Sequence, residues 1–243
     1  HIWEDKMDEV RAFFKRLVGN EPFGEYQLAP ARLLQDDKNI IIRAPTGSGK
    51  SEAVLCGHLW ALLQSEAFPQ QMVYVLPMRC LVDSLAKRFS DYLEIRGLHV
   101  AGHHGGHPAT PLFYADVVVA TIDQTVGAYA CIPLSLPVRH GNIPAGAVAS
   151  AFLAFDEVHT FDPERALQSA LVLAEHSCKL NIPFAFLSAT LPDSFVEALQ
   201  ECFDAELIDV QEEEVPVRKK RRVILSPHLD NMLTPQEVRR AWE

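Results

Sequence analysis

The stretch IIIRAPTGSGKSE, residues 40–52, decides the fold of this chain. Its first three residues are isoleucines, and such a β-branched run is typical of a strand that is buried on both faces. A short turn of small residues follows, and after it the chain repeats apolar side chains at helical spacing. The residues that share this helical face are Val54, Leu55, His58, Leu59, Leu62 and Leu63. The stretch therefore predicts a buried strand, a tight turn and a helix in direct succession.

The turn has the spacing of a phosphate-binding P-loop, except that Ala44 stands at the first glycine position. Gly47 and Gly49 allow backbone geometry that points N–H groups at phosphate oxygens, at the positive end of the helix dipole. Lys50 would neutralise the β- and γ-phosphates, and the Ser51 hydroxyl would bind Mg²⁺. The complete pattern between a strand and a helix favours this interpretation over an ordinary Gly-Ser turn. The predicted nucleotide-binding residues of the turn are Thr46, Gly47, Ser48, Gly49, Lys50 and Ser51.

A segment with two aromatic residues, PFGEYQ at residues 22–27, precedes this motif. The amide of Gln27 can both donate and accept hydrogen bonds, as the N6/N7 edge of adenine requires. The ring of Phe23 could stack on the same base. The other interpretation is a helix-capping segment with a glutamine on the surface. The P-loop nearby favours the adenine-binding interpretation.

A second motif lies about a hundred residues after the P-loop, where residues 151–155 form an apolar strand that ends at Asp156 and Glu157. A carboxylate at this position, the Walker B position, faces the Mg²⁺ of a P-loop, so Asp156 is a predicted metal ligand together with Ser51. Glu157 is the natural group to orient and deprotonate the attacking water. The alternative interpretation is an Asp-Glu pair that merely begins a loop. The upstream P-loop favours the catalytic interpretation.

Further apolar segments alternate with helical patterns along the whole chain. We expect strands at residues 72–76, 98–101, 116–120 and 184–187. We expect helices at residues 3–18, around residues 30–34 and from Asp193 to about Cys202. Two further helices are expected, one that carries Leu81, Leu85, Phe89 and Leu93 on one face and one that begins at Asp162. Residues 131–150 contain several Pro and Gly residues and predict a long connection. The alternation predicts a mostly parallel α/β sheet with helices on both faces and its motifs at the carboxyl ends of the strands.

Composition narrows the class of protein. The chain has 243 residues, of which 48% are hydrophobic, and this suits one large α/β domain or two small ones. No apolar run approaches the ~18 residues that a bilayer requires, and no signal peptide is visible, so we expect no contact with a membrane. The net charge of −10 argues against a simple electrostatic nucleic-acid binder. The five widely spaced cysteines fit a reducing compartment.

The loop GHHGGHP, residues 102–108, brings together His103, His104 and His107. Three histidines suggest a metal site, but no carboxylate lies nearby in a loop of Gly and Pro residues. A loop whose glycine amides approach a nucleic-acid backbone is favoured, and an inert turn is the remaining interpretation.

The last part of the chain changes in character. Residues 212–214 are acidic and residues 218–222 are basic, a run that could contact nucleic acid, act as a targeting signal or be solvated. A strand at residues 223–225 and a capping box at Thr234 follow. We therefore expect a helical region with the glutamine motif at residues 1–35, an ATP-binding domain at 36–210, and a linker toward a second, absent domain at 211–243.

These motifs carry a family resemblance in their order and spacing. They are Gln27, residues 44–51, LPMR at residues 76–79, AT at residues 120–121, DEVH at residues 156–159 and SAT at residues 188–190. The chain resembles the first RecA-like lobe of a superfamily 2 helicase. Flanking residues, such as FDEVHTFD at 155–162 and LSATLP at 187–192, resemble the helicase part of the CRISPR-associated helicase–nuclease of type I systems.

The resemblance implies further roles and partners. His159 would join Lys50, Asp156 and Glu157 in the catalytic machinery, and it would couple the nucleotide state to a second RecA-like lobe together with Ser188 and Thr190. The residues implied to contact single-stranded DNA are Arg79, Gly105, Gly106 and Thr121. The implied cofactors are ATP and Mg²⁺. The implied setting is a prokaryotic cytoplasm, with an RNA-guided CRISPR surveillance complex and an HD nuclease in cis or in trans.

Three departures from the family pattern bear on the function. A second lobe with its arginine finger and an HD nuclease are not found in the sequence, so we expect both outside it. Val158 departs from the alanine common in DEAH helicases, which disfavours but does not exclude an RNA helicase of the DEAD/DExH kind. A nucleotide-dependent binding module without turnover is the third possibility, and Glu157 argues against it because a pure switch needs no water-activating base.

Overall fold

The structure, a computed structural model, describes residues 2–215. The basic run at residues 218–222, the strand expected at 223–225 and the capping box at Thr234 lie outside the described residues.

An eight-stranded sheet in the order β4-β3-β5-β2-β6-β7-β1-β8 forms the centre of the molecule. Neighbouring strands are parallel throughout, except that β4 returns antiparallel beside β3. The strands are β1 Asn39–Arg43, β2 Met72–Leu76, β3 Val100–His104, β4 His107–Pro108, β5 Val117–Thr121, β6 Phe152–Phe155, β7 Phe184–Ser188 and β8 Ala205–Asp209. The strands predicted within the described residues are confirmed, and β2, β5, β6 and β7 are buried along their whole length.

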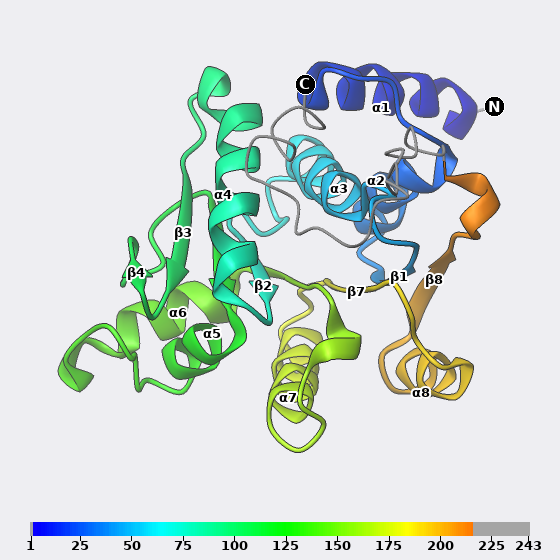
Figure 1. Cartoon of the computed structure of the whole chain (residues 1–243). Helices are drawn as coiled ribbons and strands as arrows, with labels where there is room; N and C mark the ends of the chain where they lie inside the picture. Colours follow the sequence, from blue (N-terminus) through cyan, green and yellow to red (C-terminus); the bar gives the residue numbers. More distant parts are fainter. Residues whose placement is uncertain (1, 216–243) are drawn as a thin grey trace, which may run out of the picture.

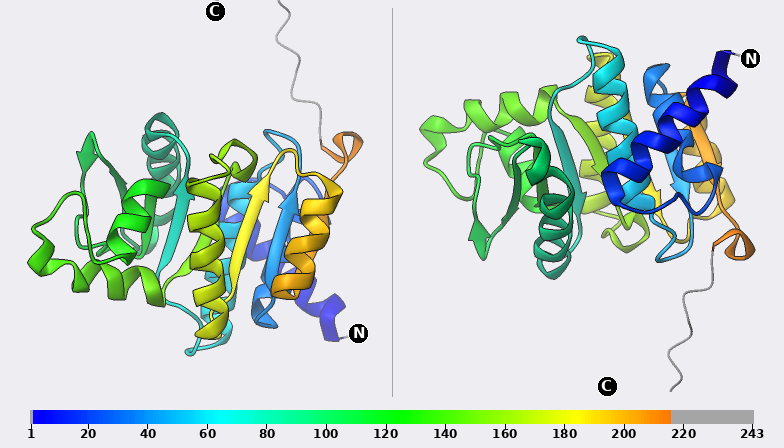
Figure 2. Two further views of the ribbon diagram at one scale, coloured as in Figure 1. Left: turned by 90° about the horizontal axis from the view of Figure 1, so that it is seen from below. Right: turned by 90° about the horizontal axis from the view of Figure 1, so that it is seen from above.

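Helices cover both faces of this sheet, as the sequence predicts (Figures 1 and 2). On one face lie α1 Ile2–Val18, α2 Ala29–Gln35, α3 Lys50–Gln64 and α4 Arg79–Leu93, and on the other lie α5 Ile122–Tyr129, α6 Asn142–Ser150, α7 Ala166–Lys179 and α8 Asp193–Phe203. Each layer encloses one cluster of buried apolar side chains. Val10 and Phe14 of α1 belong to the same cluster as the P-loop strand, so the N-terminal region packs into the main body. Among the described helices none is long and apolar enough to cross a membrane.

The helix after the P-loop is buried on more sides than its sequence pattern predicts. Leu63, expected on the apolar face of α3, is 67% exposed, whereas Cys56 and Trp60, outside that face, are buried. The reason is that α3 is packed against α1 and α2 as well as against the sheet. Its first two turns are therefore held from several directions, which fixes the loop that precedes them.

Three segments differ from the sequence-based predictions. The loop at residues 102–108 is a hairpin, in which β3 extends to His104 and pairs with β4. The connection at residues 131–150 contains helix α6, whose Pro144 sits in the first turn, where a missing N–H costs nothing. Strand β8 was not predicted, because at the edge of the sheet it mixes buried residues with exposed acidic ones instead of forming an apolar run.

The starts of two helices also differ in detail. Asp162 does not open α7: its carbonyl accepts the N–H groups of Arg165 and Leu167 in a turn, and the helix begins at Ala166. Asp193 is the first residue of α8 and does not cap it, because its carboxylate is bound by Arg43 at 2.6 Å. At Asp193 the hydrogen bond from Arg43 takes the carboxylate that the capping prediction needed, and at Asp162 a turn through the backbone carbonyl precedes the helix.

Candidate functional site

The sequence motifs meet at one edge of the sheet. Strands β6, β7 and β1 are consecutive neighbours in parallel register, and each runs directly into a motif at its carboxyl end. The P-loop follows β1, the Asp-Glu pair follows β6, and Ser188 ends β7. The predicted gathering of motifs at this edge is therefore observed.

The P-loop adopts the conformation that its glycines permit. Gly47 and Gly49 have φ angles of 84° and 80°, in the left-handed region that favours glycine. A Cβ added at Gly49 would lie 2.2 Å from the side-chain nitrogen of Gln27. Lys50 is buried, and its ammonium donates a hydrogen bond to the carbonyl of Ala44 at 3.0 Å. The loop is thus folded around its own lysine in a form that can exchange a carbonyl for a phosphate oxygen.

Gln27 contacts the P-loop directly. Its side-chain nitrogen lies 3.3 Å from the carbonyls of Ser48 and Gly49, and its side-chain oxygen accepts the backbone N–H of Phe23 at 2.6 Å. The Tyr26 hydroxyl donates to the same Ser48 carbonyl at 2.8 Å. The amide of Gln27 is therefore engaged with the chain itself, so its contact with adenine stays a prediction. Phe23 is 44% exposed at the mouth of the site.

Asp156 lies beneath the P-loop and is 5% exposed. Burial raises the pKa of its carboxyl above the ordinary value, and the Tyr74 hydrogen bond and Lys50 act in the opposite direction. Its Oδ1 accepts the backbone N–H of Glu157 at 2.8 Å. Glu157 itself has a φ of 55°, a strained conformation for a residue with a side chain, and such strain is common at functional sites.

A tyrosine that the sequence analysis did not select connects the two motifs. The Tyr74 hydroxyl, on β2, lies 2.6 Å from Oδ2 of Asp156 and 3.0 Å from Oγ of Ser51. Burial is the main cause that raises the pKa of Tyr74 well above its ordinary value. A signal was present in the sequence, because Tyr74 interrupts an apolar buried strand with a hydroxyl that must find a partner.

A second network links the Asp-Glu pair to the end of β7. Nδ1 of His159 lies 2.9 Å from Oγ of Ser188 and 3.4 Å from a carboxylate oxygen of Glu157. The Ser188 hydroxyl donates its proton to the carbonyl of Thr190 at 2.9 Å. Because that proton is used, Nδ1 of His159 must be the donor to Ser188. The structure thus brings together the residues that the sequence assigned to coupling.

A cavity of about 720 Å³ opens in front of the P-loop. Its lining includes Phe23, Gln27, Thr46, Gly47, Gly49, Lys50, Ser51, Glu52, Arg88, Asp156 and Glu157. The sequence analysis missed Glu52 and Arg88, which form an ion pair at 3.2 Å on the α4 side of the cavity. Backbone amides and one lysine near a buried carboxylate match the requirements of a nucleotide with its metal ion.

The oxygen donors at the base of this cavity fit Mg²⁺. Asp156 offers a carboxylate oxygen and Ser51 a hydroxyl, both hard ligands. In the described part of the chain no three His, Cys, Asp or Glu residues cluster as a metal site of their own. A site with one carboxylate and one hydroxyl suits an ion whose remaining ligands are phosphate oxygens and waters.

The residues implied to contact nucleic acid fall into two groups. Arg79, the first residue of α4, and Gly105 are neighbours, since a Cβ at Gly105 would lie 3.0 Å from the Arg79 guanidinium. Gly105 and Gly106 form the exposed tip of the β3–β4 hairpin. Thr121 is 2% exposed and its hydroxyl has no hydrogen-bond partner within residues 2–215. Arg79 and the glycines therefore share one surface, while the Thr121 side chain is buried.

Two of the three histidines of the hairpin are engaged with neighbouring side chains. Nε2 of His104 donates to Asp83 at 3.0 Å, because its Nδ1 accepts the N–H of Gly106. Nε2 of His103 lies 3.1 Å from the side-chain oxygen Oε1 of Gln124, and burial lowers the pKa of this histidine. These contacts anchor the hairpin to α4 and α5.

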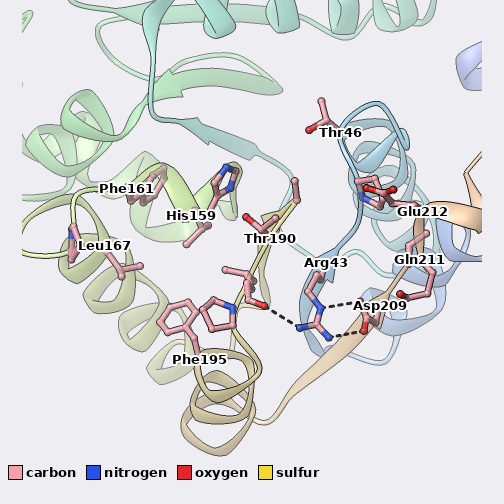
Figure 3. Close-up of a pocket in the computed structure, with 17 residues that line it drawn as sticks. Arg43, Thr46, His159, Phe161, Leu167, Thr190, Phe195, Asp209, Gln211 and Glu212 are labelled. Atoms are coloured by element: carbon pink, nitrogen blue, oxygen red, sulfur yellow. Dashed lines mark hydrogen bonds and ion pairs between the residues drawn. The ribbon is translucent and has the colours of Figure 1, made fainter. Parts of the chain in front are cut away.

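Arg43, the last residue of β1, organises the other side of the P-loop. Its guanidinium binds Asp209 through two hydrogen bonds of 2.6 and 2.9 Å and donates to the Leu191 carbonyl at 3.0 Å (Figure 3). It lines a second cavity of about 1160 Å³, whose walls include Thr46, His159 and Thr190. Arg43 thus joins the strand before the P-loop to the segment that follows Ser188, a role the sequence analysis did not foresee.

Comparison with known proteins agrees with this arrangement. The DEAD/DEAH box helicase family matches residues 25–199. The CRISPR-associated helicase Cas3 of Thermoproteus tenax is 29% identical over 197 residues, which are 74% of this chain and 34% of that protein. Putative helicase 7 of a Sulfolobus islandicus filamentous virus is 27% identical over 78% of this chain and 29% of its own length. The chain thus spans about a third of the length of these relatives.

Solved structures show the same fold at lower identity. T. fusca Cas3 with AMPPNP has a TM-score of 0.60 at 24% identity, over 78% of this chain and 24% of that one. A hypothetical ATP-dependent RNA helicase from Sulfolobus tokodaii has a TM-score of 0.57 at 21% identity, over 85% of this chain and 57% of that one. The predicted RecA-like fold and the resemblance to the first RecA-like lobe of Cas3 are confirmed. With a match over most of its length, this chain belongs to the DEAD/DEAH box helicase family.

Proposed function

We propose that this chain is the ATP-binding lobe of an ATP-dependent translocase that moves along single-stranded DNA in CRISPR antiviral defence. The observation that carries the ATP site is the convergence of Lys50, Ser51, Asp156 and Glu157 at one cavity. The identity to the T. tenax Cas3 helicase supports the CRISPR setting. A second RecA-like lobe, an RNA-guided surveillance complex and an HD nuclease are the partners we propose. The five cysteines are free thiols, which fits a reducing compartment such as the prokaryotic cytoplasm.

We propose a task for each residue of the site. Lys50 would exchange the Ala44 carbonyl for the β- and γ-phosphates, which the P-loop amides surround. Ser51 and Asp156 would hold Mg²⁺, which neutralises phosphate charge when it is bound. Glu157 would orient the attacking water and accept its proton. His159 contacts both Glu157 and Ser188, so a change at the γ-phosphate would be transmitted to the segment around Thr190.

Two variants test the ATP site. We expect Lys50→Ala to abolish detectable nucleotide binding in a calorimetric titration, because the charge that holds the phosphates is lost. With a second RecA-like lobe present, we expect Glu157→Gln to bind nucleotide normally and to lose at least ~100-fold in hydrolysis, since the water-activating carboxylate alone is removed. Unchanged affinity in the first variant, or hydrolysis within about tenfold of the original protein in the second, would overturn the assignment.

The choice of nucleic acid needs its own test. Arg79 and the glycine tip of the hairpin suit contacts to a phosphate backbone, a mode that DNA and RNA share. We therefore propose to compare single-stranded DNA and RNA of the same sequence as stimulators of ATP hydrolysis, with a second lobe present. Stronger stimulation by DNA supports the proposal. Stronger stimulation by RNA would assign the chain to the RNA helicases of the family, and binding without turnover would make it a nucleotide-dependent switch.

A further inference from the structure

Tyr74 holds the only hydroxyl within residues 2–215 that is hydrogen-bonded to both proposed magnesium ligands. It lies at the middle of β2, fully buried, with its ring packed edge-to-face on Phe89 at a centroid distance of 5.6 Å. The hydroxyl reaches Asp156 at 2.6 Å and Ser51 at 3.0 Å. Neither contact is needed to pack the ring, so the position of the hydroxyl calls for a chemical explanation.

The direction of these hydrogen bonds follows from the number of protons. A phenol has one proton, and an ionised carboxylate can only accept, so the shorter contact is Tyr74 donating to Asp156. The Tyr74 oxygen then remains as an acceptor for Ser51, whose own hydroxyl must donate to it. The result is a directional chain from Ser51 through Tyr74 to Asp156.

This series of hydrogen bonds orients the lone pairs of Ser51 and Asp156 at the base of the cavity. With the Ser51 proton pointed at Tyr74, the serine lone pairs are left for a cation, and no hydroxyl proton opposes it. Asp156 is fixed at Oδ2 by Tyr74 and at Oδ1 by the N–H of Glu157. We infer that the Tyr74 hydroxyl is a positioning group for the metal ion, which sets Ser51 and Asp156 in their binding orientation before the Mg²⁺–nucleotide arrives. The inference rests on the proposed ATP site and deepens it.

The test separates metal binding from nucleotide binding. The affinity for ADP is measured by calorimetry with Mg²⁺ and again with EDTA, for the original chain and for Tyr74→Phe, which removes the hydroxyl and keeps the ring. We expect the gain in affinity that Mg²⁺ provides to fall about tenfold in the variant, while the metal-free affinity stays within about twofold. The matched control is Tyr129→Phe, which removes a hydroxyl hydrogen-bonded to His176, far from the cavity in the fold, and should leave both affinities unchanged.

The outcomes distinguish this inference from the proposed function. If the original chain binds Mg²⁺–ADP and Tyr74→Phe keeps the whole metal-dependent gain, the inference is wrong and the ATP site stands. An equal loss with and without metal would show that Tyr74 only supports the P-loop, which also overturns it. If the original chain binds no nucleotide, the proposed function fails and the inference fails with it.

A measurement on the original chain covers the case in which Tyr74→Phe does not fold. The chain has five tyrosines, so a protein labelled with ¹³C at the tyrosine Cζ gives five resonances. Single Phe variants of the other four identify them, and the remaining resonance is that of Tyr74. Adding Mg²⁺ to the ADP-bound protein should shift the Tyr74 resonance, because the hydrogen bonding of its oxygen changes when Ser51 and Asp156 bind the ion. A Tyr74 resonance that Mg²⁺ leaves unmoved would refute the positioning role.

Discussion

Single residues at the P-loop are constrained by backbone geometry and by their neighbours at once. Gly49 has a φ of 80° and would place a Cβ 2.2 Å from the Gln27 side chain. Gly19 has nearly the same φ, 83°, but nothing lies within 4 Å of the position of its Cβ. A substitution at Gly19 would therefore measure the cost of backbone strain alone, and one at Gly49 would add the steric clash with Gln27.

We expect Gly19→Ala to lower the free energy of unfolding by about 1 kcal/mol, the cost of an alanine in the left-handed region. Gly49→Ala should cost a further ~1–3 kcal/mol, because Gln27 must move. It should also weaken nucleotide binding, whereas Gly19→Ala should not. Urea denaturation and nucleotide titration measure the two effects. Equal destabilisation by both substitutions would show that the Gln27 side chain can move aside without lowering the free energy of unfolding, which would contradict the prediction.

The buried histidine of α3 gives the protein a pH-dependent stability. His58 is 1% exposed, its Nε2 hydrogen-bonds to the Pro69 carbonyl at 3.0 Å, and its Nδ1 has no partner in the described part of the chain. Burial lowers the pKa of His58 from 6.5 to about 4. Below pH 6.5 the unfolded chain therefore takes up a proton that the native protein excludes, so stability falls as the pH decreases toward 4.

Between pH 7 and pH 5 this histidine should remove about 2 kcal/mol of stability, at about 1.36 kcal/mol for each pH unit below the unfolded pKa. His58→Gln keeps a donor for the Pro69 carbonyl and cannot take up the proton, so its stability should change that much less over the same range. Urea denaturation at both pH values measures this. His99→Gln, at an exposed histidine, is the control. An identical pH dependence in His58→Gln and the original chain would contradict the prediction.

Two helices differ in how closely they approach their neighbours. Gly57 of α3 faces α2 so tightly that an added Cβ would lie 2.8 Å from the Pro30 side chain and 3.0 Å from its backbone. Gly146 of α6 has nothing within 4 Å of the same position. Alanine is the better helix former at both sites by about 0.5–1 kcal/mol, so packing alone decides which substitution is tolerated.

We expect Gly146→Ala to raise the free energy of unfolding by up to ~1 kcal/mol and Gly57→Ala to lower it by about 1–3 kcal/mol. In the second variant α3 must move away from α2 and carry Lys50 and Ser51 with it, so nucleotide affinity should fall too. Chemical denaturation with a parallel nucleotide titration compares the pair. A Gly57→Ala protein as stable as the original would mean that α2 can shift freely.

The elements that the sequence predicts well are those whose burial is uniform. Strands β2, β5, β6 and β7 are buried from end to end because helices cover both of their faces, and their mostly apolar composition identifies them. Strand β8 lies at the edge and contains two exposed acidic residues among five, and α6 is built from small residues without a strong period, so neither is marked clearly in the sequence. In the candidate site the motif residues were predicted, whereas the roles of Arg43 and Arg88 emerge only from tertiary contacts. Tyr74 left a signal in the sequence, a hydroxyl within a buried strand, but its partners are set by the fold.

At the scale of the whole molecule, the predicted catalytic groups lie on one lobe. The only arginine that lines the nucleotide cavity within the described residues is Arg88, and Glu52 holds it at 3.2 Å. An arginine finger that reaches the γ-phosphate typically contributes ~10³- to 10⁵-fold in rate. The 243-residue chain should therefore bind nucleotide but hydrolyse it slowly.

We expect the chain by itself to turn over ATP at well below ~1 s⁻¹ with or without single-stranded DNA, and to bind that DNA weakly. Supplying a second RecA-like lobe, in cis or in trans, should raise both activities together. Steady-state ATPase assays and DNA titrations measure this. Robust DNA-stimulated turnover by the chain alone would contradict the two-lobe account, and its loss in Arg88→Ala would identify Arg88 as the arginine that acts in its place.

The position of β1 in the sheet has a consequence for synthesis on the ribosome. This strand is made early, yet its two neighbours are β7 and β8, and the Arg43–Asp209 pair spans 166 residues. At about 5–20 residues per second, the nascent chain waits roughly 8–33 s before the P-loop strand can be paired on both sides. During that time an apolar segment with unpaired backbone groups is open to misassembly. The strand that carries the P-loop is thus paired on both sides only after β8 has been made, and slower translation upstream of β8 would lengthen the time for which one edge of β1 is open.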